Sequence, residues 1–158
     1  MAATSVSARL LAAFLAILLV TAMATDLRAR IIPNWLNLAI ALLAVPWWLA
    51  LGLGLPAVGI QLALFAGALL LFAGAFAIGM MGGGDVKMIA ALALWLPPIL
   101  FGEMLVWMAL AGGVLTLAML VRHRWRRAEG RPEIPYGVAI SAASLLVLAN
   151  DILTGPAA

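Results

Sequence analysis

The chain has 158 residues, of which 67% are hydrophobic and 9% charged, and it contains no cysteine. Its 9 Lys and Arg against 6 Asp and Glu give a net charge of +3 at pH 7. A soluble domain of this size cannot bury so much apolar surface. The composition therefore excludes a globular cytosolic protein, a disulfide scaffold, a cysteine-based zinc site and a disordered chain. It predicts a small polytopic membrane protein.

Charged residues and glycine or proline turns divide the chain into apolar segments, because irregular backbone is costly in lipid. Six segments result, at about residues 10–25, 34–51, 57–80, 86–100, 103–121 and 136–153. At about 20 residues per span, six spans leave no room for a soluble domain. We therefore predict an all-α bundle of about six transmembrane helices, forming one membrane-embedded domain over residues 1–158. Asn34 is expected to be the N-cap of the second helix.

The distribution of positive charge predicts the topology, because Lys and Arg favour cytoplasmic loops. The loops after the first, third and fifth segments hold eight of the nine Lys and Arg, and the opposite side holds Arg9. This asymmetry places the N-terminus and the C-terminus outside, and Asp26 and Asp85 at the cytoplasmic face. Trp47 and Trp48 precede an outer turn and are typical of interfacial anchors.

The first segment also fits another interpretation. Arg9, the apolar run 10–20 and the small residues Ala22-Met23-Ala24 are typical of a secretory signal peptide with a cleavage site. Cleavage there would leave five spans and put the basic stretch 26–30 outside, against the charge bias of every other loop. We therefore expect this segment to remain as the first span.

Asp26 and Asp85 are the main candidates for chemistry, since ionisable groups at a membrane are functional candidates by default. Asp26 ends the first segment near Arg28 and Arg30, so the alternative is a solvated helix-end charge paired with arginine. Asp85 follows three glycines, a turn that lets another backbone approach and lets the carboxylate face a cavity. The alternative interpretation of Asp85 is an acidic residue that stabilises the N-terminus of a helix through the helix dipole. If the two segments pack together, the carboxylates can share one proton as an acid-base pair.

Two extended motifs resemble the signatures of the type IV prepilin peptidases. The first is Asp26-Leu27-Arg28-Ala29-Arg30-Ile31-Ile32-Pro33-Asn34, an Asp followed after a basic stretch by Ile-Pro-Asn. The second is Gly82-Gly83-Gly84-Asp85-Val86-Lys87-Met88, a GxGD motif continued by Val-Lys. Pro135-Tyr136-Gly137-Val138-Ala139-Ile140 is similar to the segment that opens the family's last helix. The resemblance covers residues 26–141.

The resemblance implies an aspartic endopeptidase of the bacterial inner membrane. Such an enzyme removes the short basic leader of prepilin-like proteins at the cytoplasmic face, for pilus biogenesis or secretion. The implied partners are prepilins or pseudopilins with a basic leader and a hydrophobic helix, together with membrane lipid. The positions that match the family's motifs are catalytic Asp26 and Asp85 and the supporting Gly82, Gly84, Lys87, Pro33 and Asn34.

The chain resembles a short form of the family. Longer bifunctional members carry an insert with zinc-binding cysteines after their first span and also methylate the new N-terminus. Here about seven residues separate the first two spans and cysteine is absent, so methyltransferase activity, a cofactor and a metal are not expected. The short form is similar to the Flp-type peptidases of the tight-adherence (Tad/Flp) pilus systems, the TadV or CpaA kind. Archaeal preflagellin peptidases share both Asp signatures.

Other interpretations stay open for several features. Lys87 could tune the pKa of Asp85, orient its loop or act as a positive anchor at the membrane surface. The basic cluster 122–127 is expected to contact anionic lipid rather than nucleic acid. The alternatives to a peptidase are a small ion- or proton-coupled transporter and a membrane scaffold for pilus assembly that does not cut.

Overall fold

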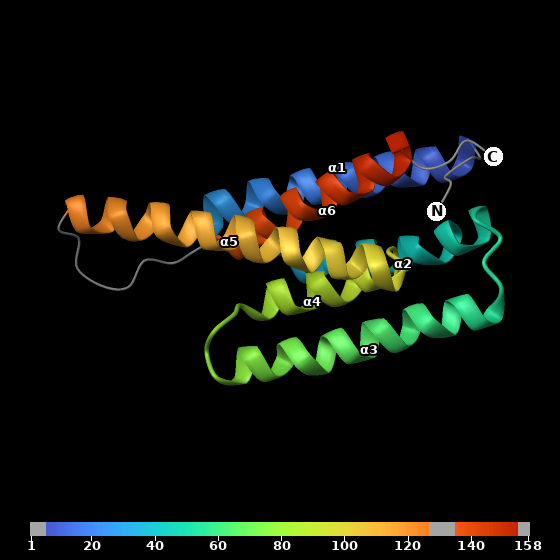
Figure 1. Ribbon diagram of the computed structural model, residues 1–158, viewed down its shortest axis with the longest axis horizontal. Coiled ribbons are helices and arrows are strands. Elements are labelled where there is room, and N and C mark those ends of the chain that lie inside the picture. Colours follow the sequence, from blue (N-terminus) through green and yellow to red (C-terminus); the bar gives the residue numbers. More distant parts are fainter. Residues whose placement is uncertain (1–5, 127–134, 155–158) are drawn as a thin grey trace.

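The computed structural model describes residues 6–126 and 135–154. Six helices lie along a common long axis, with no strand in these two ranges (Figure 1). They are α1 (Val6–Ala29), α2 (Asn34–Ala50), α3 (Leu55–Ala77), α4 (Gly83–Ala93), α5 (Pro98–Arg126) and α6 (Tyr136–Thr154). The predicted all-α bundle is confirmed. The basic cluster predicted to contact lipid lies largely outside the residues whose side chains are described.

Three helices are long and apolar enough to cross a membrane: α1, α3 and the part of α5 over Pro98–Val121. The shorter apolar helices cover Asn34–Ala50 and Tyr136–Ile152. With 11 residues, α4 is about 17 Å long, whereas the hydrocarbon core of a bilayer is about 30 Å thick. The chain is a multi-pass membrane protein in which α4 is too short to cross the bilayer. The outside location of the termini stays a prediction.

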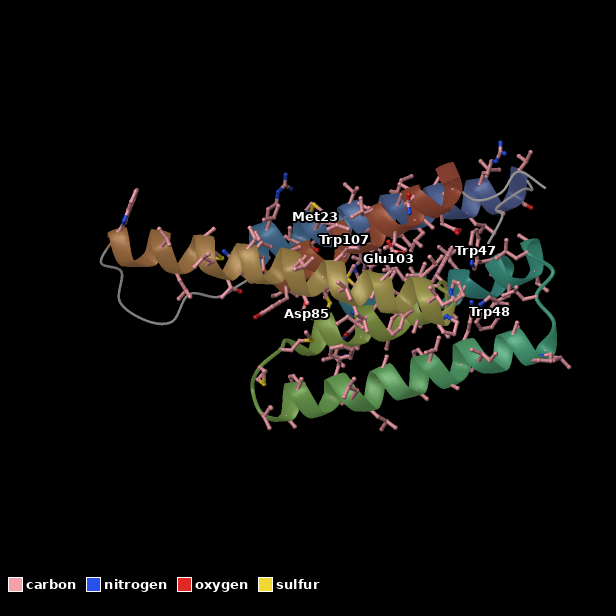
Figure 2. All side chains as sticks on the ribbon, viewed as in Figure 1. Met23, Trp47, Trp48, Asp85, Glu103 and Trp107 are labelled. Atoms are coloured by element: carbon pink, nitrogen blue, oxygen red, sulfur yellow. The ribbon has the colours of Figure 1, made fainter. Side chains whose placement is uncertain are left out.

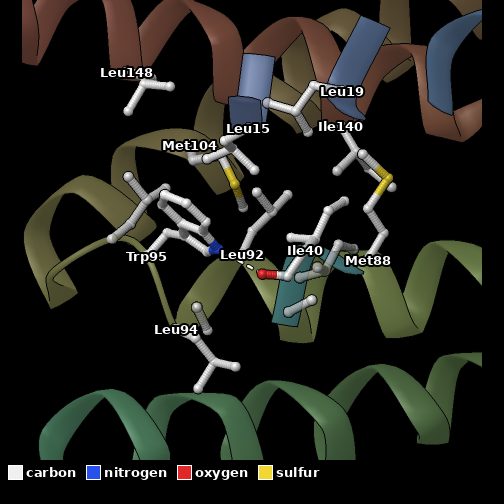
Figure 3. Close-up of a cluster of buried hydrophobic side chains, with 14 of the residues drawn as sticks. Leu15, Leu19, Ile40, Met88, Leu92, Leu94, Trp95, Met104, Ile140 and Leu148 are labelled. Atoms are coloured by element: carbon white, nitrogen blue, oxygen red, sulfur yellow. Dashed lines mark hydrogen bonds between the residues drawn. The ribbon is translucent and has the colours of Figure 1, made fainter. Parts of the chain in front are cut away.

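The short helix α4 forms the centre of the bundle. It packs against α3, α2 and α6, and every side chain from Met88 to Ala93 is at most 2% exposed. A helix that is apolar on all sides belongs in a core. Figure 3 shows Met88 and Leu92 of α4 among Leu15, Ile40 and Ile140 of the neighbouring helices. These contacts fix α4, and with it the turn that carries Asp85.

The end of the fourth segment differs from the prediction. Helix α4 stops at Ala93 and α5 already begins at Pro98, whereas the sequence predicted segments over 86–100 and 103–121. Proline lacks the N–H that a helix interior needs, but the first position of a helix does not need it. Pro98 therefore suits the first position of α5, whereas α4 has already ended at Ala93, four residues before Pro97.

The prediction that Trp47 and Trp48 are interfacial anchors is wrong for Trp47, whose side chain is 1% exposed. Its indole N–H donates to the carbonyl oxygen of Trp95 at 3.2 Å, and the indole of Trp48 donates to Leu94 O at 2.7 Å. The last carbonyl groups of a helix lack partners within it. The pair therefore holds the chain just after α4, at the end of that helix remote from Asp85 (Figure 2).

Candidate active site

Asp26 lies inside α1 and not after its end. The helix continues to Ala29, and the chain then turns at Arg30, whose φ of 57° is left-handed. The Arg30 N–H donates to the carbonyl oxygen of Asp26 at 2.9 Å. Asp26 is 5% exposed, so it is not the solvated helix-end charge that the sequence left open. The turn at Arg30 sends residues 31–33 across the end of the bundle.

The carboxylate of Asp26 is held by the first turn of α6. The N–H of Val138 donates to Asp26 Oδ2 at 3.1 Å, and the N–H of Gly137 donates to the same carboxylate. The first N–H groups of a helix have no partner within it, and the positive end of the helix dipole favours an anion there. Arg30 adds a positive charge close to Asp26. These groups fix the position of the Asp26 side chain.

Gly137 makes this contact possible. A Cβ at position 137 would lie 2.9 Å from Asp26 Oδ2 and 2.7 Å from Cδ1 of Ile32. Ile32 is buried, and it also approaches Gly84, where a Cβ would lie 3.1 Å from Ile32 Cβ and 3.2 Å from its carbonyl oxygen. Ile32 therefore fits between two glycines from distant parts of the chain. Neither Gly137 nor Ile32 was predicted to belong to the site, although both lie in segments that resemble family motifs.

The glycines before Asp85 have different surroundings. The N–H of Gly82 donates to the Asp85 carboxylate, and a Cβ at position 82 would lie 2.9 Å from Asp85 Oδ2. At position 83 the nearest atom would be 3.4 Å away, in the flexible ring of Phe76. A methyl group at position 82 would displace the Asp85 carboxylate, and one at position 84 would be crowded by Ile32, whereas position 83 needs only a small adjustment. This difference gives a physical reason for the pattern Gly-x-Gly-Asp.

Asp26 and Asp85 line the same pocket. It has a volume of about 200 Å³, and its other lining residues are Arg30, Ile31, Ile32, Gly82, Gly83 and Gly84. The two aspartates are 59 positions apart in the sequence, and the packing of α4 against α6 and of α6 against α1 brings their ends together. Of the residues predicted for the site, both aspartates and both motif glycines line this pocket.

Lys87, Asn34 and Pro33 do not line the pocket. Pro33 occupies the N-cap position of α2, where no side chain caps the helix, so the prediction of Asn34 as N-cap is wrong. Instead, Asn34 Oδ1 accepts a hydrogen bond from Lys87 Nζ at 2.8 Å. One turn further along α2, the Asn37 side-chain amide donates to the carbonyl oxygen of Gly84 at 3.1 Å. These bonds attach the first turn of α4 to α2.

Asp85 lies in the first turn of α4, outside the three helices that can cross the membrane. Burial and the negative charge of Asp26 raise the pKa of Asp85 to about 6, although the hydrogen bond from the Gly82 N–H acts in the opposite direction. Like charges at close range cannot both ionise freely. The pair therefore keeps one proton up to about pH 6 and loses it above that pH.

A reaction that needs this proton should slow as the pH rises. Between pH 6 and pH 8, the protonated fraction of a group with a pKa of about 6 falls from about one half to about 1%, so we expect a roughly 50-fold loss of rate. Initial rates in detergent between pH 5 and pH 9 would measure it. A rate independent of pH over this range would contradict a shared proton.

Lys87 provides a second test of the same titration. Its ammonium group bonds Asn34, and the causes that shift the pKa of Asp85 do not include it. Lys87→Gln keeps a donor for Asn34 and removes the charge. We therefore expect a rate within about threefold of the wild type and an unchanged midpoint of the pH profile. A midpoint that moves by a full pH unit would show that Lys87 tunes Asp85.

The model of the type IV leader peptidase family matches residues 13–121. The chain belongs to this family. The match includes Asp26, Asp85 and the glycine turn, and it identifies a protease of the prepilin peptidase kind. No curated protein and no solved structure matches the chain.

The family match to the leader peptidases ends before the residues that hold Asp26. Gly137 and Val138 lie beyond residue 121, in the segment whose sequence resembles the opening of the family's last helix. The hydrogen bonds to Asp26 supply a physical role for that segment.

Proposed function

We propose that this leader peptidase is an aspartic endopeptidase that cuts the basic leader from Flp-type prepilins at the cytoplasmic face of the bacterial inner membrane. The observation that carries the proposal is the pocket shared by Asp26 and Asp85. Both carboxyl groups are held by backbone N–H groups, so their positions are set before a substrate binds. Two carboxyl groups that share a proton are the chemical requirement for this type of hydrolysis.

In the proposed reaction, the ionised carboxylate takes a proton from a water molecule, and the water oxygen attacks the scissile carbonyl carbon. The protonated carboxyl group donates a hydrogen bond to the carbonyl oxygen. A proton then passes to the leaving amide nitrogen, and the C–N bond breaks to give a leader carboxylate and a free amine. The two carboxyl groups titrate as a unit, so the roles of acid and base belong to the pair and not to individual aspartates.

The proposed cytoplasmic location of the pocket rests on the distribution of Lys and Arg over the loops. The pocket lies at the end of the bundle where α1 ends and α4 begins, and the loops on this side carry most of the chain's Lys and Arg. The basic leader of a prepilin suits a site with two acidic groups. Its hydrophobic helix suits a site at the membrane surface. The absence of cysteine and of a long first loop supports cleavage without methylation.

A co-expression experiment tests the proposal. The chain would be produced in bacterial membranes together with small prepilins encoded near its own gene. We expect a leader-sized decrease in the mass of one prepilin, with a new N-terminus that mass spectrometry places at the end of its basic leader. Protease protection of tags on the two loops that flank the pocket would report the side of the membrane.

The opposite results have clear meanings. If the protein inserts into the membrane and no neighbouring prepilin is cut, the peptidase proposal fails. Ion flux in proteoliposomes would then test the transporter, and pilus assembly without cleavage would support the scaffold. Tags on the pocket side that are digested from outside would contradict the cytoplasmic location alone.

A further inference from the structure

A second, apolar groove lies beside the aspartate pocket, between the loop that precedes α4, the helix α5 and the start of α6. Its volume is about 420 Å³, and among the residues that the structure describes no charged residue lines it. Apolar and aromatic side chains and a glycine line it, among them Met81, Met108, Gly113, Leu117, Leu120 and Tyr136. We call this feature the α5 groove.

Two residues that line the α5 groove are neighbours in the chain of the glycines that bond the two aspartates. Met81 precedes Gly82, whose N–H donates to Asp85. Tyr136 precedes Gly137, whose N–H donates to Asp26. A segment that lies in the groove therefore ends close to the two carboxyl groups.

The shape and chemistry of the α5 groove suit an apolar helix. On α5 its lining runs from Met108 to Leu120, which is about 18 Å along the helix axis. Gly112 and Gly113 form part of its wall, and small residues let a second helix approach closely in a membrane. The Thr116 hydroxyl donates to Gly112 O at 2.7 Å, so it is already bonded within α5.

From these observations we infer that the α5 groove binds the hydrophobic helix of the prepilin, so that the scissile bond at the end of this helix reaches the aspartate pocket. This inference rests on the proposed function. It adds the surface that recognises the membrane-embedded part of the substrate, and Gly113 as a residue that controls access to it.

Another groove of similar size fits this occupant less well. It lies between α2, α3 and α4, has a volume of about 440 Å³, and is lined by Asn34, Asn37 and Lys87 at one end. An apolar helix there would remove water from the charged Lys87, which is unfavourable. Within the described part of the chain, none of its lining residues belongs to α6 or to the glycine turn before Asp85.

Gly113 allows a sharp test, because a Cβ at this position would meet nothing within 4 Å. Gly113→Leu therefore adds an apolar side chain to the wall of the groove, starting from an open position. The matched control is Gly102→Leu, on the same helix and equally open, but outside the groove. We expect Gly113→Leu to raise the KM for full-length prepilin roughly tenfold with kcat nearly unchanged, and Gly102→Leu to change neither.

Cross-linking measures the contact without catalysis. The chain has no cysteine, so Gly113→Cys or Gly102→Cys can be paired with single cysteines along the prepilin helix, in an Asp85→Asn background that prevents cleavage. We expect disulfide-linked enzyme and substrate at position 113, at least about ten times more than at position 102.

The outcomes separate this inference from the proposed function. If the wild type cuts prepilin but Gly113→Leu has normal KM and position 113 gives no specific cross-link, the groove holds lipid and the inference is wrong. Cross-linked pairs of the peptidase itself would instead assign the groove to a second copy and would also overturn it. If the wild type cuts no prepilin, the proposed function fails.

Discussion

Asp85→Asn and Asp26→Asn are each expected to reduce prepilin cleavage roughly 10³-fold or more. Asparagine has nearly the same shape as aspartate, but it cannot exchange the proton that the reaction requires. Its side-chain oxygen still accepts hydrogen bonds, so the N–H groups of Val138 and Gly82 keep a partner. The variants should therefore insert and fold normally. Gel analysis of prepilin after co-expression, combined with purified-enzyme rates, measures the loss.

The matched control is Glu103→Gln, in the second turn of α5. Glu103 accepts a hydrogen bond from the indole of Trp107 at 3.4 Å, and it does not line the aspartate pocket. Its variant should cut at the wild-type rate. An aspartate variant that is correctly inserted and still cuts at a near wild-type rate would show that this carboxylate takes no part in the reaction.

Gly137→Ala is expected to reduce cleavage roughly 10²-fold, with little change in membrane insertion. The new methyl group would lie 2.9 Å from Asp26 Oδ2 and 2.7 Å from Ile32 Cδ1, and Cβ atoms in proteins essentially never come this close to other atoms. Asp26 must then move away from the α6 N–H groups that hold it. We expect a shift of this size to misplace the proposed catalytic carboxyl group while the overall fold survives. Rates of purified variants, with melting temperatures in detergent, would separate the two effects.

The glycine turn supplies an internal control for this prediction. Gly82→Ala places a methyl group 2.9 Å from Asp85 Oδ2 and should impair cleavage as strongly as Gly137→Ala. Gly83→Ala meets only the movable ring of Phe76 at 3.4 Å, and it should retain most of the activity. Equal rates for the variants at 82 and 83 would contradict the steric explanation.

The sequence was sufficient to predict the helical bundle, because long apolar segments have few alternatives in a membrane. It also identified both aspartates and the motif glycines, since charges at the membrane and turns without side chains are visible in the sequence. The earlier end of α4 was not predicted, because an apolar run over 86–100 shows no difference between a helix and a buried turn. Trp47 was misinterpreted for a related reason. The sequence does not reveal that carbonyl groups just after α4 need hydrogen-bond donors, one of which is the indole of Trp47.

The hydrogen bonds that complete the site were beyond prediction from the sequence. Val138 and Asp26 are 112 positions apart, and only the packing of α6 against α1 brings them together. Lys87 shows the opposite case. It is two residues from Asp85, yet its ammonium group bonds Asn34 on another helix. Nearness in the sequence suggested a partner that the folded chain does not use.

The bond between the first and last helices also affects how the protein is made. Membrane proteins are synthesised from the N-terminus, so α1 and α4, with both aspartates, leave the ribosome before α6 exists. Until α6 has joined α1, Asp26 lacks the N–H donors of Gly137 and Val138. A nascent or truncated chain that ends before residue 135 would carry both aspartates without a formed site. We therefore expect the protease to cut only after its whole membrane domain has been assembled.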